Sequence, residues 1–364
     1  MARAKNGSGP IRVAIVGLGR AGWGMHCGEL DRRADKFQIV AACDIEPSRC
    51  QRMAERYPHC TTYGDITHLL QDESVELVSI ATRSPDHVPH ALAALKAGKY
   101  VFVEKPIAVT LQGAMKLKAA AAKYPGRLFV RHNRRFETEF VHIREVIDSG
   151  VLGKIFQVKL RRNSYSRRDD WQTLKGCGGG QLLNWGPHII DHALRLLDSP
   201  VSSVWSNLGL VAALGDAEDH LKIILTGRSG RVVDLEISGG AALGGPEWTV
   251  YGSKGALTCS GNTVTARYID PAMKFKTRRS SPGTPGMDGA FHQVGPDETP
   301  VWIEKTYPAA APVSTDSIWD ALYATIRQGR KFPITIEQAV EVMKIVSQVK
   351  KGTPFDTLPK YRGC

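Results

Sequence analysis

The fold is decided near the N-terminus, by the stretch Ile11-Arg12-Val13-Ala14-Ile15-Val16-Gly17-Leu18-Gly19-Arg20-Ala21-Gly22. Its apolar first half predicts a buried strand, and the G-x-G-x-x-G that follows predicts a tight turn into a helix that reaches about Asp31. Glycines here permit close approach of a diphosphate and close packing of the helix on the strand. The helix N-terminus then presents unpaired N–H groups to the phosphates. We therefore expect a dinucleotide site that includes Gly17, Gly19, Arg20, Ala21 and Gly22.

A second strand, Gln38–Cys43, supports this expectation because it ends at an acid, Asp44, at the spacing that such sites use. A carboxylate at that place can hold the hydroxyls of the adenosine ribose and would repel a 2′-phosphate, which favours NAD. Arg49 lies about one helical turn further on and could accommodate that phosphate, so NADP stays possible. Pro47 fits the first turn of the helix that carries Arg49.

The first 130 residues continue to alternate strands and helices. Further strands are expected at Val75–Ala81, Tyr100–Val103 and Arg127–Val130. Such alternation predicts a parallel, doubly wound sheet with helices on both faces. The sequence therefore predicts an α/β Rossmann domain over residues 1–130.

The pattern changes after Phe136, because strand candidates then follow one another directly. They are Ile155–Arg161, Val201–Leu208, His220–Thr226, Val232–Ile237, Trp248–Tyr251, Ala256–Cys259 and Val264–Tyr268. Strands adjacent in sequence favour an antiparallel sheet. We expect residues 131–364 to form an α+β domain with a large, mostly antiparallel open sheet, one internal helix at Gly186–Leu197 and a long loop at 271–300. Two final helices, Asp316–Arg327 and Glu337–Val349, could pack back on the first domain.

Composition narrows the class of protein. The chain has 364 residues, of which 42% are hydrophobic and 23% charged, as in ordinary globular proteins. The net charge of +12 raises the question of a nucleic-acid partner. The sequence carries no helix-turn-helix, zinc-finger or RNA-binding signature, so we expect none. No apolar run reaches the ~18 residues of a membrane span, and no apolar core of a signal peptide follows Met1.

The seven cysteines are odd in number and match no metal-binding spacing. We expect free thiols in a reducing cytoplasm and no metal site.

Two short motifs carry candidate chemistry. Glu104-Lys105-Pro106 follows a predicted parallel strand, and the carboxyl ends of such strands are where open α/β sheets bind ligands. A lysine there can hydrogen-bond a substrate hydroxyl and stabilise a developing alkoxide; the alternative is a surface lysine at a strand end. We expect Glu104 and Lys105 also to contact the cofactor, as we do Thr82, which directly follows Val75–Ala81.

The second motif runs from Gly178 to Asp191. If its helix is continuous, Asn184, His188 and Asp191 share one face. An imidazole with a pKa near neutrality suits reversible proton transfer from an alcohol. The alternative is a structural histidine on an amphipathic helix.

Taken together, these motifs resemble the Gfo/Idh/MocA family (glucose–fructose oxidoreductase and inositol dehydrogenase). The resemblance covers nearly the whole chain. It rests on the glycine loop, Glu104-Lys105-Pro106, Arg135-Phe136, Gly153, the 178–191 block and the segment Phe332-Pro333-Ile334-Thr335. It implies hydride transfer between NAD(P) and a hydroxyl of a sugar, inositol or related polyol. It also implies a homodimer or homotetramer formed through the C-terminal sheet.

The resemblance assigns roles to individual residues. Lys105 matches the family's catalytic lysine, His188 its histidine acid/base, and Asp191 the acid that orients substrate. Asn184 stands where many members have Asp. An amide can position a hydroxyl or the histidine but cannot relay a proton, so the expected catalytic pair is Lys105 and His188.

Residues 131–180 carry eleven Lys or Arg and six Asp or Glu, between the two motifs. Arg134, Arg167, Asp170 and Trp171 could line a carbohydrate pocket. The alternative is a solvated sheet face with paired charges. The predicted function is NAD-dependent oxidation of a secondary hydroxyl of a sugar, glycoside or inositol, with glycoside C3 oxidation as one version. An NAD-assisted glycosidase and a non-catalytic NAD-binding regulator remain alternatives.

Overall fold

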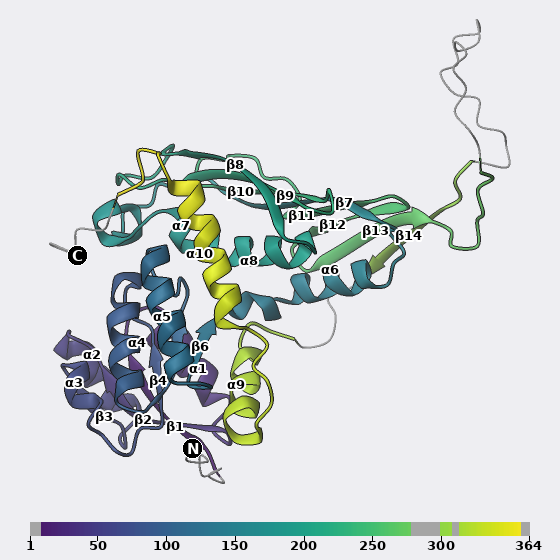
Figure 1. The fold of residues 1–364 in the computed structure, drawn as a ribbon. Coiled ribbons are helices and arrows are strands. Elements are labelled where there is room, and N and C mark those ends of the chain that lie inside the picture. The colour runs from purple at the N-terminus through teal and green to yellow at the C-terminus, as the bar shows by residue number, and fades with distance from the viewer. Residues whose placement is uncertain (1–8, 278–298, 308–312, 358–364) are drawn as a thin grey trace, which may run out of the picture.

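The computed structural model describes residues 9–277, 299–307 and 313–357. They form two sheets, one above the other in Figure 1, with helices between and around them. Much of the predicted loop at 271–300 lies outside the described residues, since 278–298 are not among them.

The first sheet has six strands in the order β3-β2-β1-β4-β5-β6, and every neighbouring pair is parallel. The strands are β1 (Ile11–Val16), β2 (Phe37–Cys43), β3 (Thr61–Tyr63), β4 (Leu77–Ile80), β5 (Tyr100–Glu104) and β6 (Leu128–Arg131). The chain order reverses between β1 and β4, which places a ligand crevice at their carboxyl ends. The predicted Rossmann sheet is confirmed; the short strand β3 was not predicted.

Helices cover both faces of this sheet. They are η1 (Gly22–Cys27), α1 (Gly28–Asp31), α2 (Pro47–Arg56), α3 (Ile66–Leu69), η2 (Ser84–Asp86), α4 (His87–Lys96) and α5 (Leu111–Lys123). Thr110 caps α5, because its side chain accepts a hydrogen bond from the Gly113 N–H. The helix after the glycine loop begins as a π-helical turn, η1, before it continues into α1.

The second sheet has eight strands in the order β14-β13-β12-β11-β7-β10-β9-β8. They are β7 (Ile155–Asn163), β8 (Val201–Gly209), β9 (His220–Gly227), β10 (Val232–Ser238), β11 (Trp248–Gly252), β12 (Gly255–Ser260), β13 (Thr263–Ile269) and β14 (Trp302–Tyr307). All pairs are antiparallel except β7 with β10. The mostly antiparallel sheet is thus confirmed. Strand β14 was missed, because it follows the long loop.

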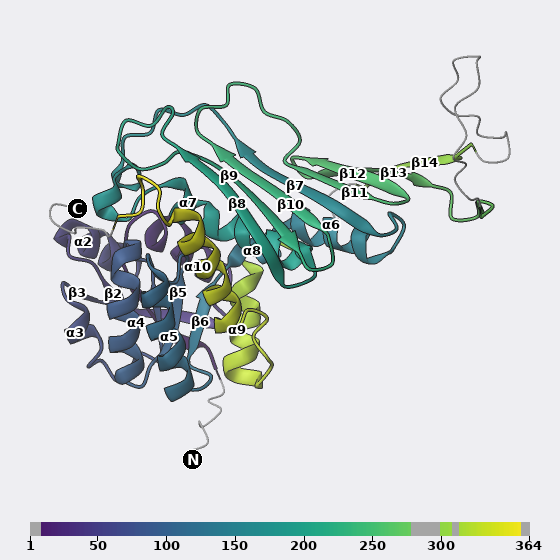
Figure 2. The same ribbon diagram turned by 45° about the horizontal axis from the view of Figure 1, so that its top comes forward.

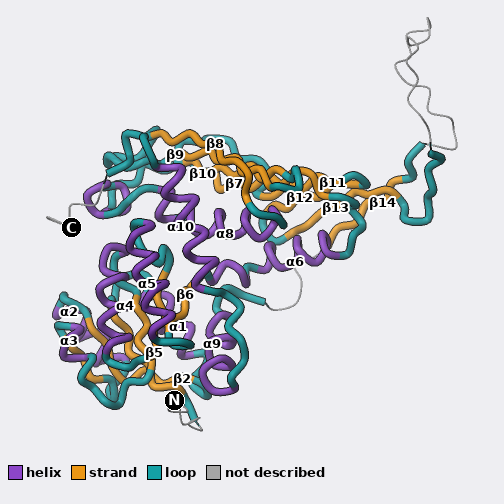
Figure 3. Tube along the Cα trace, viewed as in Figure 1, coloured by secondary structure: helices purple, strands orange, loops and turns teal. Residues whose placement is uncertain are grey.

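One face of this sheet packs on helices and the other is open (Figure 3). The covering helices are α6 (Thr138–Asp148) and α8 (Gly186–Leu197), preceded by the short elements η3 (Asn133–Phe136), η4 (Trp171–Thr173), η5 (Lys175–Cys177) and α7 (Gln181–Asn184). Strands β9 and β10 alternate buried and half-buried residues, which is the pattern of a sheet covered on one side.

The last two helices join the layers. Helix α10 (Ile336–Lys350) contacts α5 and β6 of the first layer and α8 and β8 of the second (Figure 2). Helix α9 (Ser317–Gln328) inserts Trp319 between Phe37 and Phe102, with ring centroids 5.4 and 4.8 Å apart. The C-terminal segment therefore completes the core of the first layer.

Three further properties bear on function. Within the described ranges, no helix is long and apolar enough to cross a membrane. The same residues contain no group of three His, Cys, Asp or Glu side chains that could hold a metal. Cys27, Cys43, Cys50, Cys60 and Cys259 are free thiols. The sulfur of Cys177 is in a disulfide, so the prediction of free thiols is wrong at that position.

Candidate active site

The glycine loop has the shape that a dinucleotide needs. Gly17 has φ +93°, and a Cβ there would lie 2.7 Å from the backbone of Ala81 and Thr82. A Cβ at Gly22 would lie 1.9 Å from the Gly17 carbonyl oxygen, whereas one at Gly19 would meet nothing within 4 Å. The outer glycines thus let the chain pack on itself, and the middle one faces open space into which a diphosphate fits.

Asp44 ties the end of β2 to this loop. Its carboxylate accepts hydrogen bonds from the Leu18 N–H (2.7 Å) and the Glu46 N–H (3.0 Å), and Arg49 Nη1 lies 3.3 Å from both oxygens. A carboxylate offers about four lone-pair positions and these four contacts use them, so a ribose hydroxyl would take the place of an Arg49 contact. These residues fit the adenosine half of NAD.

The remaining predicted cofactor residues lie along the same edge of the sheet. Thr82 lies just after β4 and touches the space beside Gly17, Glu104 ends β5, the next strand, and Lys105 follows it. Arg20 is exposed and Ala21 half-buried at the start of the helix. Strand order thus brings the predicted residues from three segments to one crevice.

Lys105 reaches from the first layer to the second. Its Nζ donates a hydrogen bond to the Asn184 carbonyl oxygen at 3.0 Å, and its backbone N–H donates to Glu104 Oε2 at 3.1 Å. Burial lowers the pKa of Lys105 to about 8, and Arg134 and other cations add to this, while Glu104 opposes it. The ammonium form therefore still predominates at neutral pH and can donate to an oxygen.

His188, in contrast to Lys105, is held in its neutral form. It is buried in the first turn of α8, and its Nδ1 has no hydrogen-bond partner among the described residues. Burial, followed by the charges of Lys105 and Arg134, holds the pKa of His188 well below its usual value. The neutral imidazole is the form that can accept a proton.

The continuous helix expected from Asn184 to Asp191 is interrupted. Asn184 ends α7, and α8 begins after Trp185. Asp191 is buried, and its two oxygens accept hydrogen bonds at 2.6 Å from Nε and Nη2 of Arg135. The structure therefore brings Asp191 to Arg135, and this pairing consumes much of the capacity of the carboxylate.

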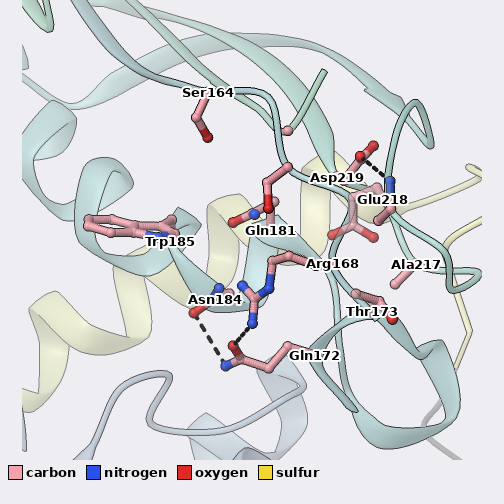
Figure 4. Close-up of a pocket in the computed structure, with 13 residues that line it drawn as sticks. Ser164, Arg168, Gln172, Thr173, Gln181, Asn184, Trp185, Ala217, Glu218 and Asp219 are labelled. Atoms are coloured by element: carbon pink, nitrogen blue, oxygen red, sulfur yellow. Dashed lines mark hydrogen bonds between the residues drawn. The ribbon is translucent and has the colours of Figure 1, made fainter. Parts of the chain in front are cut away.

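A pocket of about 140 Å³ opens beside Asn184 (Figure 4). Its polar lining includes Ser164, Ser166, Arg168, Gln172, Thr173, Gln181, Asn184, Glu218 and Asp219. Arg168 donates at 2.6 Å to both Gln172 and Asp170, and Gln172 Nε2 lies 3.4 Å from Asn184 Oδ1. Glu218 is nearly fully buried, and burial raises its pKa.

Only some of the residues predicted to bind substrate lie at this pocket. Asn184 lines the pocket, Trp171 lines a small adjoining recess, and Asp170 reaches the pocket through Arg168. Arg134 lies over the Trp185 ring, 4.2 Å from its centroid. Arg167 is exposed and is not part of the lining, whereas its neighbour Arg168 is.

Sequence reasoning did not single out the pocket residues Arg168, Gln172, Gln181 and Glu218. The arginine run contained Arg168, but a loop has no periodicity that says which of two neighbours faces inward. Gln181 belonged to the quoted 178–191 block. Glu218 lies in the β8–β9 connection, where no motif marks it.

Comparison with known proteins shows the family of the chain. Residues 11–132 match the model of the oxidoreductase family with an NAD-binding Rossmann fold, and residues 140–258 match the GFO/IDH/MocA C-terminal domain. The chain belongs to the Gfo/Idh/MocA family of oxidoreductases. The resemblance read from the sequence is thereby confirmed, as is an NAD-binding Rossmann domain.

One curated relative is similar to the chain along nearly its full length, and another along about half of it. It is 26% identical over 348 residues to scyllo-inositol 2-dehydrogenase (NADP(+)) IolW of Bacillus subtilis, covering 94% of each chain. It is 32% identical over 196 residues to D-glucoside 3-dehydrogenase of Escherichia coli, covering 53% of this chain and 56% of that one.

Solved structures share the fold. An oxidoreductase from Thermotoga maritima has a TM-score of 0.77 at 18% identity, and the match covers 96% of this chain and 97% of that one. An NAD-binding protein from Listeria innocua has a TM-score of 0.73 at 24% identity, with 92% of each chain covered.

Proposed function

We propose that this oxidoreductase oxidises a secondary hydroxyl of a neutral sugar, glycoside or inositol with NAD. The observation that carries the proposal is the contact of Lys105 Nζ, at 3.0 Å, with the carbonyl of Asn184, a residue that lines the polar pocket, together with the buried His188, which is close enough for the charge of Lys105 to lower its pKa. One group can donate a hydrogen bond to an alcohol oxygen, and the other can take up its proton. These are the two tasks that oxidation of an alcohol sets for side chains.

In this proposal the substrate hydroxyl displaces the Asn184 carbonyl from the Lys105 ammonium. His188 accepts the hydroxyl proton, and Lys105 stabilises the negative charge that develops on the oxygen. Bound NAD would supply the acceptor for the hydride that leaves the carbon, so an alcohol becomes a ketone. The side chain of Asn184, held by Gln172, positions the substrate and transfers no proton.

The charge of the pocket favours neutral substrates. Arg168 is its one cation among the described lining residues, and Arg168 is already paired with Asp170. Glu218 and Asp219 lie in the same lining. A phosphate or carboxylate group would therefore meet no unpaired positive charge there, whereas sugar hydroxyls would meet amides, hydroxyls and carboxyl oxygens.

The pocket also favours a substrate that extends away from the reacting carbon. It opens beside Asn184 and continues to the β8–β9 loop, which contributes Glu218 and Asp219. A glycoside could place its oxidised ring at Lys105 and its second group in the pocket. This supports glycoside C3 oxidation as the specific reaction, and the similarity to D-glucoside 3-dehydrogenase points in the same direction.

Domain roles, oligomeric state, cellular compartment and partners are also proposals. We propose residues 1–130 as the NAD domain and residues 131–364 as the substrate and oligomerisation domain, with α9 and α10 packed back on the first. Exposed aromatic side chains on β7 and β8, Phe156 and Trp205, support a homodimer or homotetramer formed through the sheet. We further propose a cytoplasmic enzyme with a small carbohydrate as its partner, without nucleic acid or membrane.

The test is a screen for NADH absorbance with inositols, aldoses and alkyl or aryl glucosides, run on the wild type, Lys105→Ala and His188→Ala. We expect a glucoside to be oxidised, and each substitution to reduce turnover by about 10²–10⁴-fold. Binding of NAD, measured by calorimetry, should persist in both variants.

The other outcomes are distinct. Release of aglycone without accumulation of NADH would identify an NAD-assisted glycosidase. Firm NAD binding with no turnover of any compound would identify a regulator. Wild-type rates in both variants would refute the assignment of the catalytic pair.

A further inference from the structure

A sealed cluster of charged side chains lies directly behind Lys105. Arg131 stands between two carboxylates: its Nη1 lies 2.8 Å from Glu104 Oε1, and its Nη2 lies 2.5 Å from Glu29 Oε2. All three side chains are buried. Two carboxylates and one guanidinium give the cluster one excess negative charge.

His26 completes the cluster without changing its charge. Its Nε2 lies 3.0 Å from Glu104 Oε1, and its Nδ1 lies 3.0 Å from Ser79 Oγ. A carboxylate only accepts hydrogen bonds, so Nε2 carries the proton and Nδ1 accepts from the serine hydroxyl. Complete burial lowers the pKa of His26, which keeps the ring neutral.

The cluster connects the C-terminal segment to Lys105. Trp319 of α9 donates its Nε1–H to Glu29 Oε2 at 2.6 Å. Glu29 holds Arg131, Arg131 holds Glu104 Oε1, and Glu104 Oε2 accepts the Lys105 N–H. A continuous chain of contacts therefore runs from a helix near the C-terminus to the backbone of the lysine.

Burying such charges is costly, and well-packed apolar side chains often stabilise a fold as well or better. The cluster therefore needs a reason beyond stability. One end of it touches the peptide of Lys105, and its excess negative charge lies next to the lysine. Both features would serve a lysine that has to stay oriented and protonated in a buried place.

We propose that Glu29 and Trp319 are positioning residues for Lys105, acting through Arg131 and Glu104. By sharing Arg131 with Glu104, Glu29 leaves Glu104 with uncompensated negative charge that stabilises the Lys105 ammonium. The significance for catalysis rests on the proposed function, but the electrostatic link does not.

The charged and titratable groups that act on Lys105 come from several elements. They are Glu104, Arg20, Arg131, Arg134, His87, His132 and His188. Glu104 is the acid among them. Changing how much of its charge Arg131 cancels should therefore change the protonation of Lys105.

The test measures Lys105 directly. Lysines of the full-length protein are methylated with ¹³C-formaldehyde, the Lys105 signal is assigned by its loss in Lys105→Arg, and its shift is followed against pH by NMR. Glu29→Gln frees Arg131 to neutralise Glu104, so we expect the Lys105 pKa to fall by about half a unit or more. Glu29→Asp keeps the charge and should restore a value near that of the wild type.

Trp319→Phe provides a second variant with the opposite sign. Without the indole N–H, Glu29 attracts Arg131 more strongly. Arg131 then cancels less of the negative charge of Glu104, so the Lys105 pKa should rise by about a few tenths of a unit. Asp320→Asn is the matched control, because Asp320 ties α9 to Arg33 and Lys36 without touching the cluster. It should leave the Lys105 signal unchanged.

Each outcome decides the proposal. A Lys105 titration that does not move in folded Glu29→Gln overturns it. If Glu29→Gln does not fold, a Trp319→Phe titration that is unchanged or shifted downward overturns it. The titration needs no substrate, so it can succeed even when the enzyme assay fails, and the two proposals can be judged separately.

Discussion

Two three-residue clusters flank the candidate catalytic pair, and each is the charge reversal of the other. In the first layer Arg131 lies between Glu29 and Glu104. At the start of the second layer Glu137 lies between Arg134 and Arg162, which also lie over the Trp185 ring. Counted over these three residues each, the first cluster has one excess negative charge and the second one excess positive charge, which Glu247, 3.5 Å from Arg162, partly offsets.

The difference matches the tasks proposed for the two residues. Lys105 must keep a proton, and the negative cluster lies behind it. His188 must be free to accept one, and Arg134 of the positive cluster, after burial and Lys105, holds its pKa down. The comparison teaches that opposite charge can prepare neighbouring groups to donate and to accept at the same pH.

The clusters also differ in burial. The Arg131 side chain is 1% exposed, and that of Arg134 is 27% exposed. A third pair, Asp44 with Arg49, has its arginine 47% exposed. Because water screens exposed charges, the effect of breaking a pair should fall along this series.

The largest effect is expected in the sealed cluster. Arg131→Met leaves two buried carboxylates without their shared cation, so the free energy of unfolding should fall by about 3–5 kcal/mol. Chemical denaturation followed by tryptophan fluorescence measures this. Arg134→Met is the matched control and should cost about 1 kcal/mol or less, because its end of the positive cluster reaches water. Equal losses in the two variants would show that burial does not separate the clusters.

A smaller effect is expected on the pH dependence of turnover. Arg134 lowers the pKa of both His188 and Lys105. In Arg134→Gln both values should rise, so the acid and alkaline limbs of the rate profile should both move to higher pH by about half a unit. Arg134→Lys keeps the charge and should keep the wild-type profile. Limbs that move toward lower pH, or that move equally in both variants, would contradict the comparison.

Sequence patterns over short stretches of chain were enough to predict the parallel sheet of the first layer and the mostly antiparallel sheet of the second. Strand–helix alternation, the glycine spacing and Asp44 describe elements close together in sequence, and they lead directly to a parallel sheet with its crevice. The prediction of His188 and Lys105 as catalytic residues has the same kind of basis. Each sits in a motif whose backbone context is local.

The partners of these residues could not be found this way. Asp191 pairs with Arg135, and Trp319 pairs with Glu29 across 290 positions of the chain. Long-range pairs depend on how layers dock, for which a single sequence has no periodic signal. Likewise, Arg167 is exposed whereas Arg168 lines the pocket and pairs with Asp170, and only the path of the loop separates the two neighbours.

The smallest effect is expected at the exposed end of the series. Arg49 lies 3.3 Å from both oxygens of Asp44, an ion pair at the surface that should contribute little to stability. Its side chain could instead turn toward a 2′-phosphate, which would offset the repulsion that Asp44 exerts on NADP. Arg49→Ala should therefore weaken NADP binding about tenfold, through loss of a charge-assisted hydrogen bond.

NAD has no such phosphate, so its affinity for Arg49→Ala should stay within about twofold of the wild type, and the free energy of unfolding should change by less than about 0.5 kcal/mol. Titration calorimetry with both dinucleotides measures the preference, with Arg49→Lys as the variant that keeps the charge. Equal weakening of NAD and NADP would mean that Arg49 supports the loop around Asp44 instead of reading the cofactor. In that case the Asp44–Arg49 pair would have a structural role like the two clusters. The exposure of the arginine alone would then not rank the effects of breaking the three sets of ion pairs.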